Sequence, residues 1–345
     1  MNSYITKQTL LFDFPIYNIQ FFYDNFLMIL SYSSVHILKI LQNLNVSLIH
    51  SFKDLFPKEK NKIKNLIFLK GKFGKNINIK ECKTFNILLS NDNNIIIIAL
   101  ILNLKNQIFS YKKLMSFFPS DHLIQIIELS FCDFNFFLSS TKNKKLILYK
   151  KDYNKYFLIY QTIKNITQYN IDFIQEINQS LIITFCYFES IFSFWEINNY
   201  KIINEGNLLL DLSPYTKKVY VFRNFILAGC VDFIYVIDIK NKTIVNKINI
   251  GEDWHLINYL QLNNNKILFG KIKETNEGLL ISTLQKYSYH NSKFLKLRKQ
   301  KLLVEEKLTG IIKFIKTNKK GKKINYLITS FENGLMKIIR IKNFN

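Results

Sequence analysis

Residues 327–340 read LITSFENGLMKIIR, two mainly apolar stretches separated by the polar triplet ENG. Alternation of apolar and polar residues in such short stretches indicates a β-strand with one buried face. Asn333-Gly334 is a dipeptide that tight hairpin turns favour, because both residue types tolerate a positive φ. The stretch therefore predicts a β-hairpin.

Six further stretches repeat this order of an apolar run, a short turn and a second apolar run. They are 27–40 (LMILSYSSVHILKI), 87–100 (ILLSNDNNIIIIAL), 137–150 (FLSSTKNKKLILYK), 183–196 (ITFCYFESIFSFWE), 227–238 (LAGCVDFIYVID) and 267–284 (ILFGKIKETNEGLLISTL). The seven units begin 40 to 60 residues apart. A recurring small antiparallel sheet with a period of about 40 to 45 residues is typical of propeller blades.

The composition agrees with this fold. The chain has 31 Phe and 19 Tyr but only 10 Gly and 4 Pro, and it is rich in Ile. Aromatic and β-branched side chains pack well on a pleated surface, and closed all-β folds often exceed the usual length of one domain. We therefore expect an all-β, seven-bladed β-propeller that forms a single domain over residues 1–345.

The fourteen-residue unit resembles the second and third strands of a blade in the WD-repeat (WD40-type) β-propeller family, which ends on a Trp-Asp pair. Trp195-Glu196 is the nearest match, and altered pairs stand at Tyr149-Lys150, Ile237-Asp238 and Ile339-Arg340. The family also places a Gly-His pair earlier in the blade, where this chain has Asp121-His122 and Trp254-His255. Each copy departs from the consensus, so the resemblance concerns the fold and says little about function.

The resemblance also implies structural roles for single residues. In that family the His bonds to a strand Ser, which links to a turn Asp and holds the turn. The corresponding residues here are His122, Ser139 or Ser140, and Asn143, and two more residues are assigned to blade structure, Trp195 and Asp238. Because most units lack the full set, we expect blade packing to depend mainly on Phe, Ile and Tyr.

The same family closes its propeller by pairing the first strand of the chain with the last blade. Residues 3–14 read SYITKQTLLFDF and predict a strand that precedes the first hairpin. Closure removes exposed sheet edges, which otherwise template aggregation. We therefore expect this segment to pair with the hairpin at residues 327–340.

The formal net charge of +23 raises the question of nucleic-acid binding, since clustered basic residues neutralise phosphates. Two basic insertions, residues 51–83 and 287–323, are expected beside each other in a seven-bladed ring. Their candidate RNA contacts are Lys58, Lys60, Lys62, Lys64, Lys70, Lys72, Lys75, Lys296, Arg298, Lys299 and Lys301. The alternative is compositional, because 45 of the 48 basic residues are Lys, as an AT-rich genome encodes, and charge runs are often simply solvated.

No pattern in the chain predicts catalysis, a cofactor or a metal site. The five His lie in no nucleophile motif, and the sequence contains no GxSxG, HExxH, EF-hand or P-loop signature. Cys82, Cys132, Cys186 and Cys230 form no CxxC pair, which favours reduced thiols in a nuclear or cytoplasmic protein that is not secreted. The longest apolar run, residues 95–102, is far shorter than the roughly 20 residues of a membrane helix.

These observations predict a non-catalytic scaffold that binds other proteins of a multi-subunit complex, without a membrane or a small-molecule substrate. With the basic charge, the expected setting is a nuclear RNA-processing complex, either for pre-ribosomal RNA or as the non-catalytic partner of a tRNA methyltransferase. The alternative is a cytosolic assembly scaffold without RNA contact, such as a coat, translation-initiation or ubiquitin-ligase adaptor.

Overall fold

The computed structural model describes residues 4–53, 55–56, 62–70, 81–152, 157–164, 167–209, 218–275, 280–290, 293–296, 307–317 and 323–341. Within these ranges the regular elements are strands and one short 3-10 helix, η1 (Phe131–Phe134). The chain divides into two compact units, which are described separately. Unit 1 comprises Met1–Lys53 and Thr216–Asn345, and unit 2 comprises Asp54–Tyr215.

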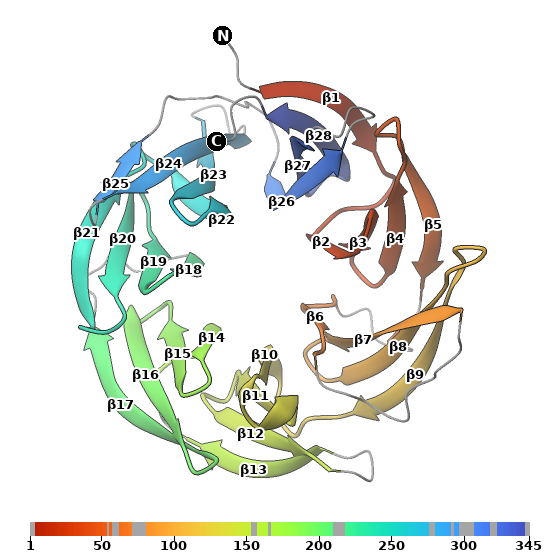
Figure 1. Cartoon of the computed structure of the whole chain (residues 1–345). Helices are drawn as coiled ribbons and strands as arrows, with labels where there is room; N and C mark the ends of the chain where they lie inside the picture. Colours follow the sequence, from red (N-terminus) through yellow and green to blue (C-terminus); the bar gives the residue numbers. More distant parts are fainter. Residues whose placement is uncertain are drawn as a thin grey trace. The chain divides into compact units, whose positions relative to one another are not determined.

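Unit 2 contains three four-stranded antiparallel sheets, each made of consecutive strands (Figure 1). The second blade has β6 (Asn65–Phe68), β7 (Cys82–Ser90), β8 (Ile95–Asn103) and β9 (Phe109–Phe117). The third has β10 (Leu123–Leu129), β11 (Phe136–Thr141), β12 (Leu146–Lys151) and β13 (Phe157–Ile163). The fourth has β14 (Phe173–Asn178), β15 (Leu181–Cys186), β16 (Ile191–Asn198) and β17 (Lys201–Leu209).

Unit 1 contains four such sheets. The first blade has β2 (Asn18–Tyr23), β3 (Phe26–Leu30), β4 (Val35–Ile40) and β5 (Val46–Phe52). The fifth has β18 (Lys218–Phe222), β19 (Phe225–Gly229), β20 (Phe233–Asp238) and β21 (Thr243–Asn249). The sixth has β22 (His255–Asn263), β23 (Lys266–Glu274), β24 (Leu280–His290) and β25 (Lys293–Lys296). The seventh has β26 (Leu308–Thr317), β27 (Lys323–Phe331), β28 (Leu335–Ile341) and β1 (Tyr4–Leu11).

All seven predicted hairpins are present as the second and third strands of these sheets, and seven such sheets make a seven-bladed β-propeller. The hairpin at residues 327–340 pairs Leu327 with Ile339 and Ser330 with Met336. Its turn runs from Phe331 to Gly334, whose N–H donates to the Phe331 carbonyl at 3.1 Å. Gly334 has a φ of 86°, which only glycine adopts without cost.

Closure by the N-terminal strand is confirmed. β1 pairs antiparallel with β28 along its length, from Tyr4 opposite Ile341 to Leu11 opposite Leu335, and lies beside it in Figure 1. The Phe12 N–H donates to the Gly334 carbonyl at 3.1 Å. A side chain at position 334 would lie 2.5 Å from the Phe12 carbonyl oxygen, so the glycine also allows the N-terminal segment to approach this turn.

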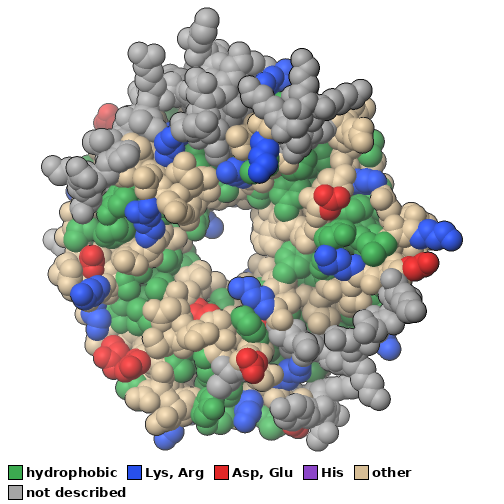
Figure 2. Space-filling model, in the orientation of Figure 1, with side chains coloured by type: hydrophobic (Ala, Val, Ile, Leu, Met, Phe, Trp, Pro, Cys, Tyr) green, Lys and Arg blue, Asp and Glu red, His purple; other side chains and the backbone are tan. Residues whose placement is uncertain are grey.

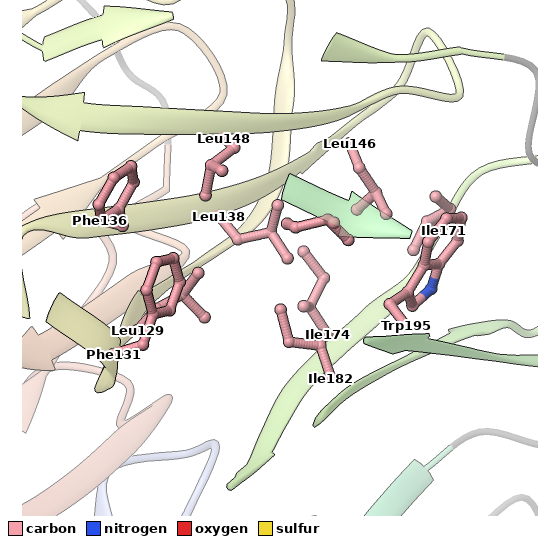
Figure 3. Close-up of a cluster of buried hydrophobic side chains, with 11 residues drawn as sticks. Leu129, Phe131, Phe136, Leu138, Leu146, Leu148, Ile171, Ile174, Ile182 and Trp195 are labelled. Carbon is pink, nitrogen blue, oxygen red and sulfur yellow. The ribbon is translucent and has the colours of Figure 1, made fainter. Parts of the chain in front are cut away.

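Apolar side chains between adjacent sheets form the core, as the composition predicted. The two middle strands of each blade are covered on both faces, which explains why they read as nearly continuous apolar runs such as residues 95–102. Figure 3 shows the cluster between the third and fourth blades, to which both sheets contribute side chains including Leu138, Leu148, Ile174 and Trp195. Comparable clusters join the second blade to the third, and in unit 1 the fifth to the sixth, the sixth to the seventh and the seventh to the first.

Both basic segments contain strands of the blades. β6 lies inside residues 51–83, and β25 and β26 lie inside residues 287–323. Alternating apolar residues among the lysines, such as Leu66 in β6, explain why strands form there: Leu66 is buried while its neighbours are partly exposed. Among the described lysines of the first segment, Lys64 and Lys70 lie next to the two ends of β6.

Candidate interaction surface

Most of the candidate RNA-contacting residues fall on parts of the chain that the structure does not describe. Outside the described residues lie Lys58, Lys60, Lys72, Lys75, Arg298, Lys299 and Lys301. Lys62, Lys64 and Lys70 flank β6 in unit 2, and the backbone of Lys296 ends β25 in unit 1. The continuous basic face remains a prediction.

Lys64 forms an ion pair instead of presenting a free charge. Its Nζ pairs with Asp92, in the turn between β7 and β8, and Lys142 Nζ lies 3.3 Å from the other carboxylate oxygen of Asp92. Burial raises the pKa of Asp92, but Lys64 and Lys142 outweigh it, and the pKa lies below its ordinary value. The Asp92 carboxylate therefore neutralises part of the positive charge at this position.

Lys70 lies at the opposite end of β6 from Lys64. Its N–H donates to Glu128 Oε2 at 2.8 Å, and its Nζ lies 5.6 Å from the centroid of the Phe134 ring. On the face drawn in Figure 2, Lys and Arg side chains are scattered among acidic and apolar ones. Among the described residues, this face has no continuous basic patch.

The predicted contact of His122 with Ser139 or Ser140 does not form. His122 is exposed while Ser139 and Ser140 are fully buried, and no hydrogen bond of the described residues joins His122 to either serine. Asp121 holds this turn instead, because its carboxylate accepts from the Asn143 amide and from Lys145 Nζ at 2.9 Å. The Lys145 contact holds the pKa of Asp121 below its ordinary value, against a smaller opposing effect of burial.

Trp195 and Asp238 make contacts consistent with blade-structural roles. The Trp195 indole is buried in the cluster between the third and fourth blades, and its Nε1–H donates to Thr184 Oγ1 on the neighbouring strand at 2.9 Å. Asp238 ends β20, and its Oδ1 accepts from the Asn241 N–H at 2.8 Å. Each contact fixes one strand or turn within its own sheet.

The sequence did not single out the Ser–His contact in the first blade. His36 and Ser51 are direct cross-strand partners in β4 and β5, with Nδ1 and Oγ 2.8 Å apart, and the imidazole stacks on Phe14. Burial and, secondarily, Lys53 lower the pKa of His36 to about 4, against an opposing effect of Asp13. An effective general base titrates near the working pH, so this pair fits a structural link between strands better than a catalytic one.

The described residues contain no group of three or more His, Cys, Asp or Glu side chains arranged to hold a metal ion. No helix in the described parts has the length and apolarity needed to cross a membrane.

An exposed apolar surface lies on β13 in unit 2. Leu158, Ile159 and Tyr160 are consecutive, and Tyr200 follows β16, and all four are between 44% and 55% exposed. We call these four residues the β13 patch. β13 carries no charged residue, although charged side chains are a common protection of edge strands. Exposed contiguous apolar residues of this kind mark interaction sites.

Local backbone geometry presents this patch. The register between β12 and β13 shifts so that Tyr149 faces Ile159 and Leu148 faces Gln161, which leaves Tyr160 as an extra residue in a β-bulge. Tyr200 has a φ of 64° in the turn between β16 and β17, a region that bulky residues rarely occupy.

Buried aromatic rings pack against the two tyrosines of the patch. The buried Phe136 ring lies 5.5 Å from Tyr160 and 5.9 Å from Tyr200 between centroids, and it stacks on Phe131 at 4.8 Å. Lys150 Nζ lies about equally far from the rings of Phe136 and Tyr160, at 5.9 and 6.0 Å. The two exposed tyrosines are therefore packed on a buried base, which lowers the entropy cost of binding through them.

Two glutamine side chains hold the third blade to the fourth. The Gln161 amide of β13 donates to the Ile202 carbonyl at 3.1 Å and accepts from the Ile202 N–H at 2.9 Å. Gln125 of β10 makes the same pair of bonds with Ile174 of β14, at 3.0 and 2.8 Å. Each glutamine amide makes the two hydrogen bonds that a neighbouring backbone would make. The Gln161 side chain therefore links β13 to β17.

Comparison with known proteins gives the fold and no closer relationship. No family model matches the chain, and no curated protein matches it. Among solved structures the chain is similar to the crystal structure of Sqt1 from Saccharomyces cerevisiae, with 8% sequence identity and a TM-score of 0.58 over 99% of this chain and 98% of that one. With its seven four-stranded sheets and the closing strand β1, the chain has the fold of a WD40-type seven-bladed β-propeller.

Proposed function

We propose that this chain is a non-catalytic scaffold that binds partner proteins of a multi-subunit complex, with the β13 patch as one of its binding surfaces. The observation that carries the proposal is an uncharged edge strand with three consecutive exposed apolar residues beside an exposed Tyr200. Tyrosine is enriched where interfaces gain most of their binding energy. A rigid propeller with several exposed surfaces suits a protein that joins partners rather than transforms a substrate.

The test compares two matched double variants in the native cells. Leu158→Ser with Tyr160→Ser alters the patch, whereas Ile244→Ser with Val245→Ser alters β21, another edge strand with two similarly exposed apolar residues. We expect the first variant to lose at least one stoichiometric partner and the second to keep all of them. Identical partner sets for both variants and the original chain would remove the patch from the proposal.

A second, finer proposal concerns RNA. The net charge of +23 favours a subunit of a nuclear RNA-processing complex in which the basic segments contact RNA, over a cytosolic scaffold without RNA. Affinity for a single-stranded RNA should then fall steeply with salt concentration, because phosphate contacts release counterions. Changing Lys58, Lys60, Lys62 and Lys64 to Gln should flatten that salt dependence, and an unchanged slope would count against RNA contact at this segment.

A further inference from the structure

Two exposed aromatic rings lie against each other, tilted by 33°, one just before the fourth blade and one in the turn between its second and third strands. Tyr169 precedes β14 and is 42% exposed, and Phe188 lies between β15 and β16 and is 60% exposed. Their ring centroids are 3.9 Å apart. Neither residue belongs to the β13 patch, and neither is needed to fill the core.

Two carboxylates accompany these rings. Glu189 follows Phe188, and its Oε1 accepts from the N–H of Gln168, the neighbour of Tyr169, at 2.6 Å. Its Oε2 is buried and accepts no hydrogen bond from a described residue. Asp172 Oδ2 accepts from the Tyr187 N–H at 2.9 Å.

These carboxylates differ from Asp92 and Asp121, the acidic residues at the corresponding connections of the second and third blades. Asp92 pairs with Lys64 and Lys142, and Asp121 pairs with Lys145. Among the described residues, neither Asp172 nor Glu189 has a Lys or Arg partner within ion-pair distance. The chain has a net charge of +23, but the negative charges of Asp172 and Glu189 are not balanced by an ion pair with a described residue.

Neighbouring groups respond to that charge. Burial raises the pKa of the Cys186 thiol to about 11. Hydrogen bonds from the backbone of Glu189 and Phe188 lower this pKa, and the charges of Glu189 and Asp172 raise it. Burial also raises the pKa of Tyr187, with a further contribution from Asp172. A cation entering this place would be stabilised, whereas an added anion would be repelled.

We propose that Tyr169, Phe188, Glu189 and Asp172 form a binding site for an arginine side chain in an extended segment of a partner protein. A guanidinium stacks on aromatic rings and pairs with carboxylates through its planar set of donors. The aromatic pair alone would also suit a nucleic-acid base, but the two carboxylates repel the phosphates that accompany one. The site rests on the scaffold proposal and specifies the chemistry of one partner.

The test uses the full chain and a labelled peptide, Gly-Arg-Gly-Arg-Gly-Arg-Gly, with a Gln-for-Arg peptide as the reference, in fluorescence anisotropy at fixed salt. Glu189→Gln and Asp172→Asn remove charge while keeping an acceptor oxygen for Gln168 and Tyr187, so the turn should stay folded. We expect at least tenfold tighter binding of the Arg peptide than of the Gln peptide, and a loss of threefold or more in each variant. Phe188→Ala should weaken binding similarly.

Matched controls are Glu196→Gln, an exposed carboxylate of the same blade, and Phe118→Ala, an exposed aromatic residue of the same unit. Both should bind the Arg peptide like the original chain, and thermal unfolding should show all variants folded. Unchanged binding by Glu189→Gln, Asp172→Asn and Phe188→Ala would overturn the site.

Two other outcomes would indicate a different ligand at this site. Binding of an oligouridine that Phe188→Ala abolishes and Glu189→Gln strengthens would indicate a base-stacking platform. Self-association of the original chain that Glu189→Gln abolishes would indicate a second copy as the occupant. Because the peptide assay needs no cellular complex, a negative result leaves the β13 patch test unaffected, and loss of partners in that test does not decide this one.

Discussion

Trp195 shows how one side chain serves both packing and polarity in this fold. Its ring lies in the cluster between the third and fourth blades (Figure 3). The indole Nε1–H donates to Thr184 Oγ1 inside the same sheet. A buried indole N–H must find an acceptor, and Thr184 supplies it across the strand pair. The sequence assigned Trp195 to blade structure through a resemblance, whereas the Thr184 partner follows only from the register of β15 and β16.

Trp195→Phe is expected to destabilise the protein by about 1–3 kcal/mol, since it leaves the Thr184 hydroxyl buried without its donor and removes ring volume. Urea unfolding measures the effect. Thr184→Val should cost little more when added to Trp195→Phe, because both changes remove the same bond. Full additivity of the two costs would contradict the importance of that bond.

His36 should make stability depend on pH. Its folded pKa of about 4 lies below the ordinary 6.5, so the folded state binds fewer protons than the unfolded state between these values. The stabilisation is complete above pH 6.5 and is lost as the pH falls towards 4, an effect of about 3 kcal/mol at most. His36→Gln should flatten the change in urea midpoint over this window, and an unchanged pH profile would show that His36 is not responsible.

At the scale of elements, the third and fourth blades combine an apolar cluster with amide side chains that bond to the backbone of the adjacent sheet. Gln125 and Gln161 each satisfy one N–H and one carbonyl of the fourth blade. Glu176 adds a third polar link, because its carboxylate accepts from both the N–H and the hydroxyl of Ser130. These links set the position of one sheet against the next more specifically than apolar contact does.

Gln161→Leu should destabilise the protein by about 1–3 kcal/mol, because the Ile202 N–H and carbonyl lose their partners. The matched control is Gln175→Leu, since the Gln175 side chain is exposed and, within the described parts of the chain, donates to the carbonyl of the next residue alone. Thermal or urea unfolding compares the two. Equal costs would mean that the Gln161 amide is not a structural link.

The sequence predicted the hairpins, because the pattern of apolar and polar residues within one short stretch determines them. Hairpins such as residues 137–150 depend on alternation and on a turn between neighbouring strands, so a single stretch contains the signal. The bulge at Tyr160 and the Gln161 link depend on a register between strands and on a second blade, which no local pattern records. The uncharged stretch FLIYQTI at residues 157–163 was a signal for the β13 patch, but the sequence alone did not show that it forms an edge strand.

The site residues were predicted less well for the same reason. His122 was chosen by its place in the repeat, but the neighbouring Asp121 makes the contact with Asn143. The His–Ser contact that does occur joins His36 and Ser51, which become partners only through the pairing of β4 with β5. The sequence alone could not distinguish Glu189 and Asp172 from acidic residues that form ion pairs, because it does not show which lysines lie near them.

At the scale of the whole molecule, β1 completes the seventh blade and covers the edge of β28. Deleting residues 1–14 should therefore give an insoluble protein, because β28 would expose an unpaired strand edge. Deleting residues 1–3, which precede β1, is the control and should leave solubility and melting unchanged. A soluble, cooperatively melting chain without residues 1–14 would contradict the closure.

The central claim is that this propeller works as a protein scaffold, and the mass of the native complex tests it most directly. Size-exclusion chromatography with light scattering would be applied to the chain purified under mild conditions from its own cells, before and after nuclease treatment. The account predicts a stable assembly well above the 41.1 kDa of one chain that persists after nuclease. A mass equal to one chain under both conditions would contradict it.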